Sequence, residues 1–192
     1  MGALDDGIRL RMPDAAAWRA WLEEHHARST GAWLVRARPG STEVLVEYET
    51  AVEHALCFGW VDGPTRTFDE LSGGLWFAPR RPQSAWAASN RERVERLEAA
   101  GLMTDAGRRV IAAAKANGAW SVLMGPESGI EPPELTAALD AVPEARAAWD
   151  AFPPSARKLG LTTVAMAKRP ETRTARIAKL VADAAAGIRP TT

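Results

Sequence analysis

A cysteine and a nearby histidine are the first candidates for reactive chemistry in this chain. His54 and Cys57 are three positions apart in the segment "ETAVEHALCFGWVDGPTR" (residues 49–66), so a helix places them on one side. A histidine so placed can lower the pKa of a thiol and prepare a nucleophile. Cys57, however, directly precedes the expected helix end at Gly59, where the helix dipole disfavours an anion. We therefore interpret Cys57 as a buried, inert thiol, with a nucleophile as the less favoured alternative.

Metal and cofactor binding find little support. The other two histidines, His25 and His26, are adjacent, so a helix cannot direct both at one site. One cysteine allows neither an intramolecular disulfide nor a cage of thiolates. The sequence contains no HExxH motif, no P-loop, no dinucleotide fingerprint and no GxSxG elbow. We expect no metal and no cofactor.

Polar and aromatic residues instead gather in two motifs of the N-terminal half. The first, "GWVDG" (residues 59–63), presents Trp60 and Asp62 from an extended segment, and Asp62 is a weak candidate for a catalytic acid or base. The second, "PRRPQSAWAASNRER" (residues 79–93), contributes the candidate binding residues Arg80, Arg81, Ser84, Trp86, Asn90 and Arg93.

The second motif is expected to begin a helix. Trp86, Asn90 and Leu97 then share one stripe, and the buried amide of Asn90 either anchors a loop or lines a pocket. Arg80 and Arg81 are expected to precede the helix start, where free backbone N–H groups can hold a phosphate or a carboxylate.

A third motif, "AKRPETRTAR" (residues 167–176), adds a cluster of cations near the C-terminus. Arg173 lies one turn before the apolar position Ile177, so we place it at the boundary between core and solvent. The motif either forms a solvated basic face or points into a cleft, and its candidate binding residues are Lys168, Thr172, Arg173 and Arg176.

Charge is balanced overall but not along the chain. The 24 basic and 24 acidic residues give a formal net charge of zero. Basic residues predominate in segments 76–119 and 153–192, and acidic residues in 1–75 and 120–152. The two basic segments can converge on an anion, or they can pair with the acidic segments, which is the interpretation we favour.

Composition predicts a cytoplasmic protein. The chain has 192 residues, 46% of them hydrophobic, which suffices for a full core. No segment approaches the roughly 18 apolar residues of a membrane helix, and the N-terminal residues lack the apolar run of a signal peptide. We expect no membrane partner.

Periodicity predicts an α+β fold. Residues 1–118 should form a small antiparallel sheet with helices, including weak strands at "GIRLRM" and "EVLVEY" and a helix over 51–58 that a Thr50–Glu53 capping box opens. Residues 119–192 should be helical, with prolines at the helix starts. We expect the two portions to pack as one domain.

The three motifs together resemble the bacterial YdeI/OmpD-associated family, also called bacteriocin-protection proteins, over most of the chain. The resemblance rests on the motif residues Gly59 to Gly63, then Pro79, Arg80, Ser84, Trp86, Asn90 and Arg93, and then Ala167, Lys168, Glu171, Thr172, Arg173 and Arg176. It implies, through the family's name, protection against bacteriocins and antimicrobial peptides and a link to an outer-membrane protein, and it implies no general enzymatic reaction. A role in a stress response belongs to the leading hypothesis below.

The leading hypothesis is a binding or stress-protection protein whose three motifs line one cleft walled by Trp60 and Trp86. Its partner would be a small anionic or amide-bearing molecule or a peptide. The first alternative is an enzyme that uses Asp62 as acid or base beside an arginine-lined anion site. The second is nucleic-acid binding through residues 153–192, which the neutral charge balance disfavours.

Overall fold

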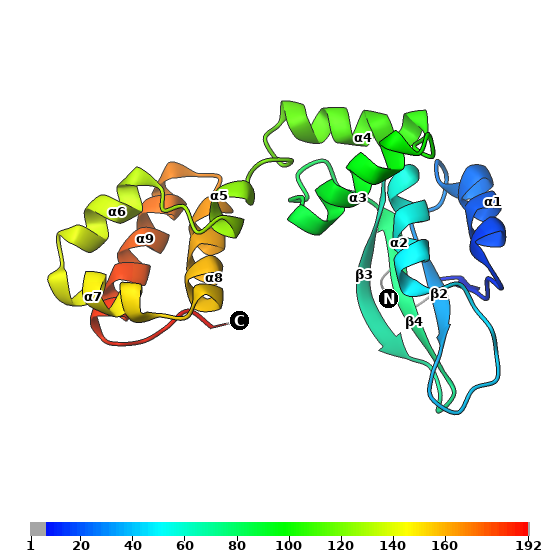
Figure 1. Cartoon of the computed structure of the whole chain (residues 1–192), viewed down its shortest axis with the longest axis horizontal. Helices are drawn as coiled ribbons and strands as arrows, with labels where there is room; N and C mark the ends of the chain where they lie inside the picture. Colours follow the sequence, from blue (N-terminus) through cyan, green and yellow to red (C-terminus); the bar gives the residue numbers. More distant parts are fainter. Residues whose placement is uncertain (1–6, 192) are drawn as a thin grey trace. The chain divides into compact units, whose positions relative to one another are not determined.

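The computed structural model describes residues 7–191, and the chain divides into two compact units (Figure 1). The N-terminal unit comprises Met1–Ser84 and Ser89–Ala119, and the C-terminal unit comprises Ala85–Ala88 and Trp120–Thr192. Residues 1–6 lie outside the described residues, and the expectation that the N-terminus lacks a signal peptide rests partly on them. The expected α+β fold is confirmed, with the sheet in the N-terminal unit and a helical C-terminal part.

The N-terminal unit is built on a four-stranded sheet in the order β1-β2-β4-β3. Its strands are β1 (Arg9–Leu10), β2 (Ala32–Ala37), β3 (Trp60–Thr67) and β4 (Ser72–Pro79). The edge strand β1 runs parallel to β2, and the other pairs are antiparallel. The hairpin of β3 and β4 places Asp62 opposite Phe77, and the register shifts just after Asp62.

Two helices, α1 (Ala15–His25) and α2 (Tyr48–Cys57), pack beside each other and against the sheet (Figure 1). Asp14 caps α1 by accepting a hydrogen bond from Ala17 N–H at 2.8 Å. Trp18 then joins the layers, because its Nε1–H donates to Ala51 O and its ring contacts Phe77.

The start of α2 corrects two expectations. Helix α2 begins at Tyr48, and no side chain caps it, so Thr50 lies inside the helix and the capping box is wrong. The segment "EVLVEY" forms no strand, and the N–H of its Val46 donates to Met12 O instead. Alternating apolar residues predict a strand only where a neighbouring strand pairs with them.

Helices α3 (Ala88–Ala99) and α4 (Asp105–Ala116) follow the sheet. Gly59 ends α2 as expected, with a φ of 75° that favours glycine. A Cβ at Gly59 would come within 2.6 Å of Val110, so the glycine also lets α4 approach the end of α2. Thr104 caps α4 and donates its hydroxyl to Cys57 O at 2.6 Å.

The C-terminal unit consists of α5 (Met124–Glu127), α6 (Pro133–Asp140), α7 (Pro143–Ala151), α8 (Pro154–Ala165) and α9 (Pro170–Ala185). The last four helices begin at proline, as expected, because proline lacks the N–H that a first helical turn leaves unpaired. Trp149 is the largest side chain of their shared core, and Gly160 of α8 lies against its ring. Within residues 7–191, none of the helices has the length and apolarity needed to cross a membrane.

Candidate functional site

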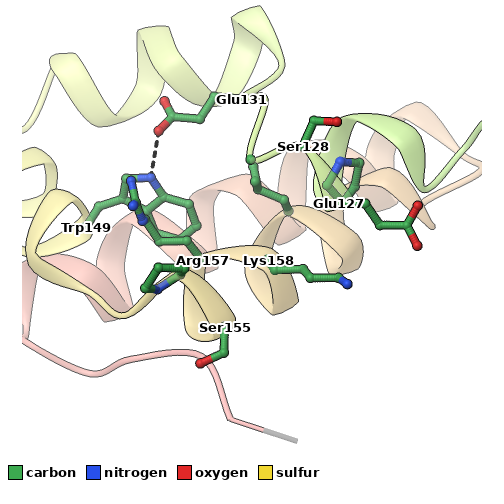
Figure 2. Close-up of a pocket in the computed structure, with 11 residues that line it drawn as sticks. Glu127, Ser128, Glu131, Trp149, Ser155, Arg157 and Lys158 are labelled. Atoms are coloured by element: carbon green, nitrogen blue, oxygen red, sulfur yellow. Dashed lines mark hydrogen bonds between the residues drawn. The ribbon is translucent and has the colours of Figure 1, made fainter. Parts of the chain in front are cut away.

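The C-terminal unit contains a pocket of about 470 Å³ between the α5 segment, α7 and the first turns of α8 (Figure 2). Figure 2 shows Glu131 above Trp149, Ser128 and Glu127 on the α5 side, and Arg157, Lys158 and Ser155 along α8. The full lining is Pro126, Glu127, Ser128, Gly129, Glu131, Trp149, Pro154, Ser155, Arg157, Lys158 and Leu161.

The negative charge of the Glu131 carboxylate is already compensated by side chains of the same unit. Arg146 donates to both of its oxygens, at 2.8 and 2.9 Å, and Trp149 Nε1–H donates to Oε1 at 2.7 Å. These contacts, led by the hydrogen bonds from Arg146, hold the pKa of Glu131 below its usual range. Glu131 therefore stays ionised, and its charge is balanced before any ligand enters the pocket.

The cations of the pocket are not balanced in this way. Arg157 Nε is buried and has no hydrogen-bond partner among residues 7–191. Lys158 is exposed at the pocket, and no side chain caps the start of α8. A buried N–H without an acceptor costs about 1–3 kcal/mol. An anion bound to Arg157 Nε would relieve that cost.

The third motif mainly joins two helices. Arg173 donates to Val164 O at 3.3 Å, and Arg176 donates to Thr163 O at 2.6 Å, so both cations satisfy carbonyl groups at the C-terminal end of α8. Arg173 also pairs with Glu134 and lines a neighbouring cavity of about 220 Å³. Of the other predicted residues, Lys168 is exposed and Thr172 half-buried.

In the first motif, Trp60 is buried and Asp62 is half-buried. Trp60 Nε1–H donates to His26 O at 3.2 Å, and its ring lies edge-on to Trp21. Asp62 Oδ2 accepts a hydrogen bond from the Tyr48 hydroxyl at 3.1 Å. Burial is the main cause that raises the pKa of Tyr48, so the phenol remains a donor.

Two arginines of the second motif, Arg80 and Arg93, are attracted electrostatically by Asp62. Arg80 is only 7% exposed, and this burial lowers its pKa to about 10 against the attraction of Asp62. Arg93 donates to both oxygens of Glu49 at 2.7 Å and to Asn90 Oδ1 at 2.9 Å. Hydrogen bonding to Glu49 raises the pKa of Arg93, so its charge is compensated within the unit.

The rest of the second motif does not form the expected stripe. Trp86 precedes α3 and packs against Trp120, with ring centroids 4.9 Å apart, so it belongs to the C-terminal unit and does not share a helix face with Asn90. Arg80 and Arg81 do not adjoin a helix start, because α3 begins only at Ala88. Ser84 is half-buried and Arg81 is exposed.

The thiol that first suggested chemistry is buried, as expected. Burial raises the pKa of Cys57 and lowers that of His54, and Arg19 adds to the second effect. Both shifts oppose a thiolate–imidazolium pair, so the inert interpretation is supported.

The structure thus brings the first two motifs together around Asp62, while the third lies in the C-terminal unit. A cleft shared by all three motifs stays a prediction. Sequence reasoning missed Tyr48 and Glu49, which lie in the first turn of α2. It also missed the pocket residues Glu131, Trp149, Arg157 and Lys158. The available signal was "PPSARK", two cations in the first turns of a proline-started helix.

Two family models match separate parts of the chain. Residues 10–110, just over half of it, match a family described as a domain of unknown function (DUF8412). Residues 129–187 match the family described as "Bacteriocin-protection, YdeI or OmpD-Associated". The chain therefore belongs to the DUF8412 family, and its residues 129–187 are similar to the YdeI/OmpD-associated family. No curated protein and no solved structure was found to match it.

The resemblance to the YdeI/OmpD-associated family was expected over most of the chain, but the family model matches only residues 129–187. The third motif lies inside residues 129–187, but the first two motifs lie in the DUF8412 match. Most of the pocket of Figure 2, from Gly129 to Leu161, falls within the YdeI/OmpD-associated match.

Proposed function

We propose that this protein binds a small anionic ligand in the pocket of the C-terminal unit, with a carboxylate or phosphate group held by Arg157 and Lys158. The observation that carries the proposal is that Arg157 lines a cavity of about 470 Å³ and that its buried Nε has no acceptor among the described residues. A cavity of this volume is within the range of small-molecule sites.

The two cations supply different parts of the recognition. The guanidinium of Arg157 offers a planar fork that matches carboxylate or phosphate oxygens, and Lys158 adds a mobile point charge. Glu131 does not compete for them, because Arg146 and Trp149 already occupy its oxygens. Glu127, the second carboxylate of the lining, accepts a hydrogen bond from Ala88 N–H. The two cations can therefore attract an anion although two carboxylates form part of the wall.

The cellular role belongs to the same proposal. A cytoplasmic protein that captures an anionic antimicrobial compound, or an acidic or amide-bearing peptide, would fit the protective role in the printed name of the family. The single, buried cysteine supports a reducing compartment.

The alternatives receive less support from the contacts. Acid–base catalysis by Asp62 has to compete with the Tyr48 hydrogen bond at Oδ2. Nucleic-acid binding through residues 153–192 has to recruit Arg173 and Arg176, which already donate to carbonyl oxygens of α8. Neither contact affects Arg157.

A thermal-shift screen tests the proposal. Inorganic phosphate, succinate and short acidic peptides are added to the full chain, and a ligand present at about 100 times its Kd stabilises the folded state by about 2.7 kcal/mol. We expect Arg157→Gln and Lys158→Gln to reduce the shift in melting temperature. Lys179→Gln, which removes an equal charge from an exposed pair with Asp183, should leave it unchanged. Equal shifts in all four proteins would exclude this pocket as the site.

A further inference from the structure

The N-terminal unit contains a second cavity, of about 330 Å³, remote in sequence from the pocket proposed above. It lies between one face of α4 and the region where α1, α2 and β4 end. Ala106, Val110 and Ala113 line it from α4 at the i, i+4, i+7 spacing of a single helix face. It is therefore a groove along α4.

The opposite wall is apolar and rigid. Phe58 and Trp60 are both buried, and Trp60 is fixed by the hydrogen bond from its Nε1–H to His26 O. Gly59 sets the width of the groove, because any side chain there would collide with Val110. A preformed apolar wall of this kind binds an apolar body with little ordering cost.

Every ionisable side chain that lines the groove is basic or neutral. Arg80 lies in the wall at 7% exposure, Arg109 lies exposed at the rim, and His26 lies half-buried beside them. No aspartate or glutamate is among the lining residues, since Asp62, which attracts Arg80, lies outside the lining. The positive charges of Arg80 and Arg109, in a lining without an acidic side chain, favour an anionic ligand.

We propose that this groove is a binding site for a small carboxylate with an apolar or aromatic body. The carboxylate would pair with Arg80 and Arg109, and the body would lie along Ala106, Val110 and Ala113. A carboxylate fits better than a phosphate, because a monoanion loses less hydration than a dianion when it enters an apolar groove. The volume limits the body to about one ring, since it is at the lower end of ligand pockets.

Phenylacetate is a suitable probe, and benzyl alcohol is its neutral counterpart of similar shape. In isothermal titrations of the full chain we expect phenylacetate to bind at least about tenfold more tightly than benzyl alcohol. Equal affinities would overturn the proposal, because the arginines would then contribute nothing. Absence of phenylacetate binding up to about 10 mM would overturn it as well.

Two neighbouring alanines provide a matched pair of variants. Ala113→Phe fills the groove from an exposed helix face and should weaken phenylacetate binding at least about tenfold. Ala112→Phe adds the same ring one residue away, outside the lining, and should leave binding unchanged. Equal effects of the two variants would contradict the assignment. Arg109→Gln at the rim should weaken binding severalfold, and this variant does not require replacement of the buried Arg80.

The pocket of the C-terminal unit is also proposed to bind anions. Phenylacetate binding there has to be distinguished from binding in the groove along α4. In a chain with both Arg157→Gln and Lys158→Gln, phenylacetate binding and its loss in Ala113→Phe should persist. If the double substitution abolishes phenylacetate binding, the groove on α4 is not the site. Failure of the proposed function leaves this outcome unaffected, because the two sites share no residue.

Discussion

Each unit places an arginine at the wall of a cavity, but the surroundings of the two arginines differ. In the C-terminal unit, Arg157 shares a polar pocket with Lys158 and with an acid that Arg146 has already neutralised. In the N-terminal unit, Arg80 lies among apolar side chains, and burial lowers its pKa to about 10. A wet, polar pocket selects a ligand mainly by charge, whereas an apolar groove also selects by shape. We therefore propose that the same residue type serves two different ligand classes in one chain.

The largest predicted effects concern the cores that hold the two sites. Trp149 in the C-terminal unit and Trp60 in the N-terminal unit are both almost fully buried. Replacement of either by alanine should cost about 3–5 kcal/mol of unfolding free energy. Hydrogen exchange should show lost protection in helices α6–α9 for Trp149→Ala and in strands β3–β4 for Trp60→Ala. Equal losses in both units for either variant would show that the chain behaves as one cooperative body.

Glu131→Gln should have the next largest effect, because it removes the carboxylate from a cluster that Arg146 and Trp149 share. Partly buried charged hydrogen bonds of this kind contribute about 1.5–3 kcal/mol. Urea unfolding should show a loss near 2 kcal/mol. Glu134→Gln, which affects an exposed carboxylate paired with Arg173 on the same unit, is the control and should cost much less.

The loss of unfolding free energy at low pH should depend on the same carboxylate, that of Glu131. The folded state holds the pKa of Glu131 below its usual value of about 4.3. The contribution is therefore complete above the unfolded-state pKa and is lost as pH falls through the lower, folded-state pKa. Unfolding measured between about pH 5 and pH 2 should show a steeper decline for the wild type than for Glu131→Gln. Parallel profiles would mean that Glu131 is not the group concerned.

The smallest effect on unfolding free energy is expected from a change next to Asp62 in the N-terminal unit. Tyr48→Phe removes the hydrogen bond to Asp62, and Tyr48 is exposed to water. The loss of unfolding free energy should be about 0.5 kcal/mol or less, within the lower range for a single hydrogen bond. A loss as large as that of Glu131→Gln would remove the contrast between Asp62, which accepts one hydrogen bond from an exposed phenol, and Glu131, which accepts from Arg146 and Trp149.

Local patterns predicted the elements better than the sites. Proline at helix starts and Gly59 at the end of α2 report backbone geometry that the residue itself dictates, so those predictions hold. The "EVLVEY" strand failed because no strand among residues 7–191 pairs with it, and the Thr50 capping box failed because α2 begins earlier, at Tyr48.

The candidate sites depended on contacts between distant segments. Asp62, Arg80 and Arg93 were predicted together from their motifs. In the structure Asp62 lies on β3, Arg80 directly follows β4, and Arg93 comes from α3. The pocket beside Trp149 was missed, because its lining comes from three segments that no single period connects. Only the folded chain shows that Arg146 donates hydrogen bonds to both oxygens of Glu131. It also shows that Arg157 Nε has no acceptor among the described residues.

The most direct measurement observes the Arg157 Nε–H group itself. A nitrogen-15 spectrum of the arginine side chains is recorded while inorganic phosphate or succinate is added, and Arg157→Lys assigns the signal by removing it. We predict that the Arg157 Nε–H resonance moves downfield and saturates, as expected for a new hydrogen bond to an anion, while the Arg146 resonance stays in place. An Arg157 resonance that does not move while the anion stabilises the protein would exclude Arg157 from the binding site.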